Sequence, residues 1–312
     1  MPLSPYIDEL VDTGKELKGS ELVQLSGLLD DELDELRGRW GEIDPPRRRE
    51  ILTTLIELAD DSCDLDFGAV YDTALADPDA AVRERAVSGL WESDDRRSIP
   101  KLTGLLSDDA DERVRAAAAL VLGHFAVLAV TGKLVERDAA RVSGALMAAL
   151  SNEDEAVAVR RRALEAVAAF MTPEVAEWIR WAYESDEPEV RQSSLHAMGR
   201  SGDLSWLPTI YREMQSGEPA MRYEAANAAR EVGETESVPY LADLVEDPDV
   251  EVALAAVLAI GLIGGARAKK LLGGIAAADE DEAVREAAAE AIHLMETDES
   301  GLSFPKVSDR LG

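Results

Sequence analysis

A short sequence motif recurs seven times along this chain at nearly constant spacing. It joins an acidic or small polar turn, often with a proline, to Val-Arg and an alanine-rich segment, as in residues 77–90. Its apolar anchors are spaced by 32, 45, 31, 31, 31 and 32 residues and lie at Val82, Val114, Val159, Val190, Met221, Val252 and Val284. A constant period of this length indicates a stacked repeat array, in which each repeat packs only on its neighbours.

Each period contains the pattern of two amphipathic helices joined by an acidic turn. Residues 98–106 and 238–245 are typical of the first helix, and the Val-Arg segment begins the second. An aspartate followed by proline suits a helix start, so we expect Asp77 and Asp247 to be N-caps. Glycines are expected to end several second helices, at Gly199, Gly233 and Gly264.

These patterns predict an all-α protein, a right-handed α-solenoid of about eight two-helix repeats. We expect the array to span residues 44–296, with Arg48 marking a degenerate first repeat. Residues 1–43 fit the repeat poorly and are expected to form an N-terminal helical cap, because the end of a solenoid would otherwise expose apolar surface. The spacing of 45 predicts an insertion at about 124–137, and residues 297–312 are expected to be a flexible tail.

The chain is strongly acidic, with 63 Asp and Glu against 32 Lys and Arg and a net charge of -31. Nucleic-acid binding requires cations that neutralise phosphates, so the balance argues against it and against an anionic membrane surface. A basic protein would be attracted, although solubility or adaptation to high salt explains the acidity equally well. The longest apolar runs, near 116–130 and 252–266, are about 15 residues, short of the roughly 20 that span a bilayer.

Motifs for catalysis are missing from the sequence. Neither Gly-x-Ser-x-Gly nor a phosphate-binding loop occurs, and the single cysteine, Cys63, has no identifiable histidine partner. One cysteine allows no internal disulfide, and the N-terminus lacks a secretory pattern. We therefore expect a cytoplasmic protein that is not an enzyme, with no catalytic, cofactor-binding or metal-binding residues and no cofactor.

The motif Asp-Pro-Asp-x-x-Val-Arg-x-x-Ala, at a period of 31 residues, resembles the bacterial HEAT-like repeat of the phycobilisome-lyase type. The resemblance covers about 44–296 and is clearest at 77–90, 109–123, 187–199 and 279–292. It implies relatives that are interaction scaffolds, chromophore lyase subunits or iron-dependent hydroxylases with His-Glu pairs. Here no glutamate adjoins any histidine, so the ligands of such a hydroxylase are missing at His124, His196 and His293.

An arginine follows the anchor in most repeats, at Arg83, Arg115, Arg160, Arg191, Arg222 and Arg285. A carboxylate such as Asp79 or Asp111 precedes it by three to five residues. We expect these arginines to form a ladder of charge-assisted hydrogen bonds between repeats rather than a track for a ligand. The three tryptophans of the middle repeats are expected in the core, at Trp178, Trp181 and Trp206.

A binding face follows from helical geometry. At about 100° per residue, an anchor at i with buried partners at i+4 and i+8 leaves i+2 and i+6 pointing away from the core. In the middle and later repeats these positions carry arginine, tyrosine, amide and leucine side chains, which suit a docking surface. The predicted partner-binding residues on the concave face are Arg161, Arg162, Gln192, His196, Tyr223, Asn227, Leu254 and Leu258.

The sequence thus predicts a non-enzymatic scaffold that binds a protein or peptide in the concave groove. A basic partner is favoured, with no nucleic acid and no membrane, and the chain is expected to be a monomer or weak homodimer. The resemblance supplies an alternative, a lyase-like or chaperone-like subunit that assists attachment of a chromophore or cofactor. Binding of a tetrapyrrole, seen as visible absorption, distinguishes the two.

Overall fold

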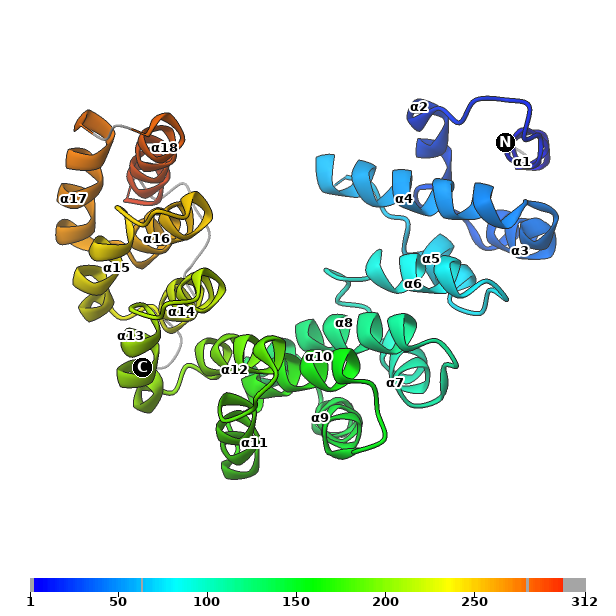
Figure 1. Ribbon diagram of the computed structural model, residues 1–312. Helices are drawn as coiled ribbons and strands as arrows, with labels where there is room; N and C mark the ends of the chain where they lie inside the picture. The colour runs from blue at the N-terminus through cyan, green and yellow to red at the C-terminus, as the bar shows by residue number, and fades with distance from the viewer. Residues whose placement is uncertain (1–2, 63, 279–280, 300–312) are drawn as a thin grey trace. The chain divides into compact units, whose positions relative to one another are not determined.

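The computed structural model describes residues 3–62, 64–278 and 281–299, and within these ranges the chain forms helices and no strand. It divides into two compact units, Met1–Phe170 and Met171–Gly312. Each unit is a succession of helices (Figure 1) and is described by itself. Cys63 and residues 300–312 of the predicted tail lie outside the described residues.

The first unit contains ten α-helices among its described residues. They are α1 (Ser4–Val11), α2 (Gly19–Leu22), α3 (Asp30–Arg39), α4 (Pro45–Asp61), α5 (Gly68–Ala74), α6 (Ala80–Ser88), α7 (Ile99–Asp108), α8 (Glu112–Val130), α9 (Glu136–Ser151) and α10 (Val157–Val167). The second unit continues with α11 (Pro173–Tyr183), α12 (Pro188–Ser201), α13 (Leu207–Glu213), α14 (Pro219–Val232), α15 (Val238–Leu244), α16 (Val250–Ile263), α17 (Gly265–Ala278) and α18 (Glu282–Glu299).

The helices from α5 onward pack as successive pairs, α5 on α6 through α17 on α18. Within each unit the second helices also pack on one another, as α4, α6, α8 and α10 and as α12, α14, α16 and α18. All seven predicted anchors are buried on these second helices. The predicted all-α architecture of two-helix repeats is therefore confirmed, whereas the handedness of a superhelix and the boundaries of a cap, an array and a tail stay predictions.

The helix starts correct one sequence expectation. The N-caps of α6 and α16 are Asp79 and Asp249, whose carboxylates accept hydrogen bonds from the backbone at the start of each helix. Asp77 and Asp247 were expected there but lie two residues earlier, where each accepts the backbone N–H of the true cap at 2.8 and 2.9 Å. A proline lies between the two aspartates of each pair, directly after Asp77 and Asp247, so the expected aspartate-proline pattern selected the residue that supports the cap rather than the cap itself.

A second correction concerns Gly199. The left-handed residue that ends α12 is Gly202, at φ 63°, while Gly233 and Gly264 end α14 and α16 as expected. Gly199 lies inside α12, where a Cβ would stand 2.6 Å from Cα of Ala228 on α14. Glycine is thus needed there for the close approach of two second helices rather than for a turn.

The long 45-residue spacing falls at α8 and α9, which have 19 and 16 residues. In the described chain α8 is the one helix long and apolar enough to cross a membrane by length and composition, and half of its apolar window is buried. It packs against α6, α7, α9 and α10 as a repeat helix does. Its apolar character therefore has an explanation in the packing of the first unit.

The predicted arginine ladder is present at Arg83, Arg115, Arg191 and Arg222, which reach forward into the next repeat. Arg160 differs, because its Nε donates to the Leu150 carbonyl of the preceding turn. Arg83 donates to both carboxylate oxygens of Asp109 at 2.7 and 2.8 Å, and Arg222 donates likewise to Asp247 at 2.6 and 2.7 Å. Arg115 binds Glu155 at 2.7 Å, and the degenerate first repeat contributes a buried pair between Arg48 and Asp77. These partners lie 25 to 40 residues onward, so the carboxylates three to five residues earlier are not the acceptors.

Several ladder arginines also bind the turn that precedes their own helix. The Nη1 atoms of Arg83, Arg115 and Arg222 donate to backbone carbonyls six residues earlier, at 2.7, 2.7 and 2.9 Å. The planar guanidinium carries five N–H donors in a fixed geometry. It can therefore pair with both oxygens of a carboxylate in the next repeat and also donate to a backbone carbonyl of the turn before its own helix. The ladder therefore fixes where each second helix begins relative to its neighbour.

The pKa values of the ladder carboxylates are lowered by their arginine partners. Hydrogen bonds from Arg222 hold the pKa of Asp247 below its usual range, although burial opposes them. At Asp109 burial alone would raise the pKa, but hydrogen bonds from Arg83 and from the backbone of Asp111 outweigh it and lower the pKa. Both groups are therefore held in the charged form that the arginines bind.

Candidate functional site

The second unit presents three consecutive second helices, α12, α14 and α16, that carry six of the eight predicted site residues. Close helix packing aligns them, since Gly199 of α12 meets Ala228 of α14. A second close approach lies further along, because a Cβ on Gly261 of α16 would lie 2.8 Å from Cβ of Ala291 on α18. The six residues, termed the α12–α16 stripe, are Gln192, His196, Tyr223, Asn227, Leu254 and Leu258.

The stripe changes chemistry from helix to helix. Gln192 and His196 are half-buried on α12. On α14, Tyr223 is 38% exposed, and the half-buried amide of Asn227 donates to the Tyr223 carbonyl at 3.2 Å. On α16, Leu254 is half-buried and Leu258 is 46% exposed. The stripe thus has a polar start, an aromatic centre and an apolar end.

Arg161 and Arg162, the other two predicted site residues, lie on α10 in the first unit. Arg162 is exposed and donates to Glu165 one turn onward at 2.7 Å, while the Glu165 side chain is buried. Arg161 is half-buried and has interaction partners of its own. Their membership of one site with the α12–α16 stripe stays a prediction.

The structure adds two leucines that the sequence reasoning missed. Leu262, one turn beyond Leu258 on α16, is 51% exposed, as is Leu294 on the neighbouring α18. Both occupy the position ten residues after the anchor, the next turn of the same face. Extending the i+2 and i+6 rule by one helical turn would have found them. Leu258, Leu262 and Leu294 are referred to below as the leucine patch.

The first helices of the second unit carry a separate aromatic cluster. Trp178 and Trp181 pack edge to face at 5.4 Å between ring centroids, and Tyr211 stacks on Tyr240 at 3.9 Å. Trp206 is buried, as predicted for all three tryptophans, but Trp178 is only half-buried and Trp181 is 45% exposed. The core assignment of Trp181 is therefore wrong.

The histidines are separated in the fold as in the sequence. Nε2 of His124 lies 2.7 Å from an Asp94 carboxylate oxygen, His196 lies on the stripe, and His293 is exposed on α18. Across residues 3–62, 64–278 and 281–299, no three His, Cys, Asp or Glu side chains converge as metal ligands. The residues described thus do not fit a metal centre.

Paired helices, close second-helix packing and a forward arginine ladder together define an α-helical repeat protein. A family model described as HEAT repeats matches residues 70–143, 143–212 and 207–293. The chain therefore belongs to the HEAT-repeat family. The resemblance to a HEAT-like repeat, which the Val-Arg motif indicated, is confirmed.

Similarity to named proteins is more distant. Deoxyhypusine hydroxylase of Mus musculus is 30% identical over 104 residues, which are 33% of this chain and 34% of that protein. Deoxyhypusine hydroxylase of Danio rerio is 27% identical over 127 residues, 40% of each chain. The chain thus aligns with well under half the length of either relative. The solved complex of CpcE and CpcF of phycocyanin lyase from Nostoc sp. PCC7120 has a TM-score of 0.52 at 17% identity, covering 76% of this chain and 94% of that one.

These relatives correct the expectation that the protein is not an enzyme. Both curated matches are named as a hydroxylase, which contradicts that expectation. The prediction from sequence was based on the absence of catalytic motifs. Such motifs consist of residues that lie close together along the chain, in one loop or helix. A site on a repeat array draws side chains from separate repeats, so a missing local motif could not exclude one. The likeness to the lyase complex shows the fold alone.

Proposed function

We propose that this protein is a HEAT-repeat platform that binds a protein or peptide along the α12–α16 stripe. The observation that supports this most is the run of exposed Tyr223 and Leu258 on adjacent second helices, continued by the leucine patch. Aromatic and aliphatic side chains held on rigid helices lose little conformational freedom on binding. Exposed leucines in register on two packed helices are a surface that a partner would cover.

The chemistry around the stripe favours a partner with positive charge. Glu286 and Glu290 are exposed on α18 beside the leucine patch, and the chain as a whole has a charge of -31. Such a field accelerates association with a basic partner and weakens as salt is added. We therefore expect the partner to combine apolar anchors with flanking Lys or Arg.

The test compares two pairs of substitutions with the same chemistry. The stripe variant is Tyr223→Ala with Leu258→Ala. Its control is Tyr240→Ala with Leu204→Ala, which removes a tyrosine 41% exposed and a leucine 53% exposed from the first-helix side of the same unit. Partners captured from lysate by the wild type would be identified, purified and titrated against all three proteins.

A loss of about 2 kcal/mol or more in the stripe variant, with the control within about 0.5 kcal/mol of wild type, supports the proposal. If only the control variant loses affinity for the partner, the binding surface is instead the aromatic cluster on α11, α13 and α15. Equal affinity of all three proteins for the partner contradicts the stripe as a binding surface.

A second candidate function is enzymatic, favoured by the relatives named deoxyhypusine hydroxylase. The described residues do not bring three potential metal ligands together. The direct test incubates the purified protein, iron(II), O2 and a two-electron reductant with a protein that carries deoxyhypusine, and it measures gain of one oxygen by mass spectrometry. Gain of oxygen establishes the activity, and its absence under conditions where a hydroxylase works removes this candidate. The lyase-like alternative has only the fold likeness behind it.

A further inference from the structure

The leucine patch is an apolar surface toward the carboxyl ends of two packed helices. Leu258, Leu262 and Leu294 are 46%, 51% and 51% exposed. Helices α16 and α18 lie side by side (Figure 1), and a Cβ on Gly261 would lie 2.8 Å from Cβ of Ala291. Leu262 follows Gly261 directly and Leu294 comes one turn after Ala291, so the leucines of the two helices are neighbours. Three exposed leucines on neighbouring turns indicate a surface that another segment covers.

The face that carries the leucine patch also carries negative charge. The positions two, six and ten residues after the anchor are leucines on α16, and on α18 they are Glu286, Glu290 and Leu294. Both glutamates are exposed. The occupant of this face therefore needs apolar side chains next to positive charge.

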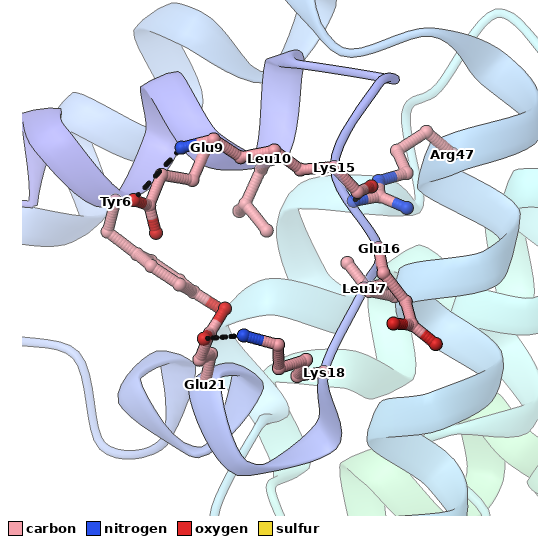
Figure 2. A pocket seen from close by; sticks show the side chains of 9 residues that line it. All are labelled: Tyr6, Glu9, Leu10, Lys15, Glu16, Leu17, Lys18, Glu21 and Arg47. Carbon is pink, nitrogen blue, oxygen red and sulfur yellow. Dashed lines mark hydrogen bonds and ion pairs between the residues drawn. The ribbon is translucent and has the colours of Figure 1, made fainter.

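The hollow among the N-terminal helices of the first unit places no comparable demand on an occupant. In Figure 2 its lining includes Lys15 with Glu9 at 3.2 Å and Lys18 with Glu21 at 3.0 Å, two ion pairs that are exposed to solvent. These charges satisfy one another, so no ligand is needed there. Leucine side chains cannot be satisfied in that way, because only burial against another apolar surface removes them from water.

The residues that follow α18 combine apolar side chains with positive charge. Residues 300–312, termed the 300–312 segment, lie outside the described residues, and their sequence reads Ser-Gly-Leu-Ser-Phe-Pro-Lys-Val-Ser-Asp-Arg-Leu-Gly. Two cations, Lys306 and Arg310, against the single acid Asp309 give a side-chain charge of +1, in a chain of net charge -31. Large apolar side chains are interspersed with them at Leu302, Phe304, Val307 and Leu311. The segment thus has the composition that the face of α16 and α18 requires.

The connection is also short enough for the 300–312 segment to reach the leucine patch. Since α18 continues to Glu299, its rise of about 1.5 Å per residue places the end of the helix roughly 8 Å beyond Leu294. An extended chain advances about 3.3 Å per residue, so the five residues to Phe304 span about 16 Å and can return to Leu294. The residues from Phe304 to Leu311 can then cross to α16, because packed helix axes lie about 8–10 Å apart. Tethering gives the segment a local concentration on the order of millimolar, so a weak contact is enough.

We propose that the 300–312 segment binds the leucine patch within the same molecule. Its apolar side chains cover Leu258, Leu262 and Leu294, and its two cations face Glu286 and Glu290. This inference rests on the proposed function in one respect, because the segment has the chemistry expected of the partner and therefore competes with it for the α16 end of the stripe. The segment is thus a built-in competitor that a partner must displace.

Hydroxyl-radical labelling of the full chain, read by mass spectrometry at each residue, measures whether the leucine patch is covered. The segment variant combines Leu302→Ser, Phe304→Ser and Leu311→Ser. The three leucines of the patch should be oxidised at least about threefold faster in this variant than in wild type, since a tethered contact covers the patch most of the time. Leu120 and Leu204, which are 54% and 53% exposed, are internal controls whose oxidation should not change.

A second variant tests the charge of the segment without removing any of its large apolar side chains. Lys306→Glu with Arg310→Glu should also expose the leucine patch, because the two glutamates of α18 then repel the segment, and added salt should reduce the effect. The matched control is Arg267→Glu with Lys270→Glu, which changes the net charge equally at exposed positions of α17. That control should leave oxidation of the patch as in wild type.

Equal oxidation of the leucine patch in wild type and in the segment variant overturns the proposal. Protection that grows with protein concentration also overturns it, because a second copy of the chain is then the occupant. Labelling uses no partner, so protection of the patch supports the contact even if no partner binds the α12–α16 stripe. Where a partner does bind, the segment variant should bind it about threefold more tightly or better, because the competitor is gone. A partner that binds the stripe of a protein whose patch is unprotected leaves the proposed function standing and overturns only the role of the segment.

Discussion

Arg83 of one repeat holds Asp109 of the next through two parallel hydrogen bonds of 2.7 and 2.8 Å. The pair is shielded from solvent, since the side chains are 15% and 4% exposed. The same guanidinium binds the Asp77 carbonyl of its own turn at 2.7 Å. One side chain therefore sets the position of two neighbouring repeats, which makes the rung a sensitive point for stability.

Arg83→Ala should lower the free energy of unfolding by about 2–4 kcal/mol, because it leaves the buried Asp109 carboxylate without its cation. Urea unfolding followed by circular dichroism measures the loss, and hydrogen exchange locates it in α6 to α8. Arg113→Ala is the control, because Arg113 is 60% exposed and its pair with Asp111 should contribute less than about 1 kcal/mol. Equal losses in the two variants would show that the ladder contributes nothing beyond a surface ion pair.

Gly199→Ala should destabilise the second unit by about 1–3 kcal/mol, because the new methyl group would lie 2.6 Å from the Ala228 backbone and force α12 and α14 apart. The matched control is Gly144→Ala within α9, where a Cβ meets nothing within 4 Å. That change should stabilise by about 0.5–1 kcal/mol, the usual gain of alanine over glycine in a helix. Thermal unfolding of both variants measures the two signs, and stabilisation by Gly199→Ala would contradict the close approach.

The Arg222–Asp247 rung predicts a defined pH dependence. The folded-state pKa of Asp247 is lowered, first by hydrogen bonds from Arg222. A lowered pKa contributes stability above the unfolded-state value of about 4, and that contribution is lost as pH falls through the folded-state pKa. The gap in unfolding free energy between wild type and Arg222→Ala should therefore be widest at pH 7 and shrink toward pH 3.

The comparison uses the difference between two proteins because acidification also relieves the self-repulsion of this acidic chain, which acts in the opposite direction on the absolute curve. Urea titrations of both proteins at steps of pH give the measurement. A gap that stays constant from pH 7 to pH 3 would show that the Asp247 carboxylate is not what Arg222 stabilises.

One rung of the second unit can be improved. Ser216 occupies the place that Asp109 and Asp247 hold elsewhere, six residues before the ladder position of its helix. Arg191 therefore reaches instead to Glu218, at 3.4 Å. Ser216→Asp should restore a bidentate acceptor and stabilise by about 0.5–1.5 kcal/mol in chemical unfolding. The reverse change, Asp247→Ser, should destabilise by at least as much, and a neutral result for both would refute the equivalence of the positions.

Much of the repeat architecture followed from local pattern. The period placed all seven buried anchors, and four of the arginines that follow an anchor, Arg83, Arg115, Arg191 and Arg222, were correctly assigned to a ladder. The same helical angles that buried the anchors predicted Tyr223 and Leu258 as exposed. These features repeat within one helix, so a single sequence displays them without knowledge of the fold.

Other features depend on where separate repeats meet. The acceptors of the ladder lie 25 to 40 residues beyond each arginine, so nearby carboxylates misled the assignment. Gly199 looked like a helix end because only its contact with Ala228 reveals a packing role. Enzymatic activity could not be excluded from missing motifs, as the relatives show.

The sequence by itself therefore determined the repeat, its two-helix content and the buried side of each second helix, because hydrophobic periodicity acts along neighbouring turns. Only the tertiary structure decided which carboxylate each ladder arginine holds and that Gly199 is needed where α12 meets Ala228 of α14. The physical reason is that these contacts join residues of different repeats, and which residues meet there is set by packing between helices rather than by the periodicity within one helix.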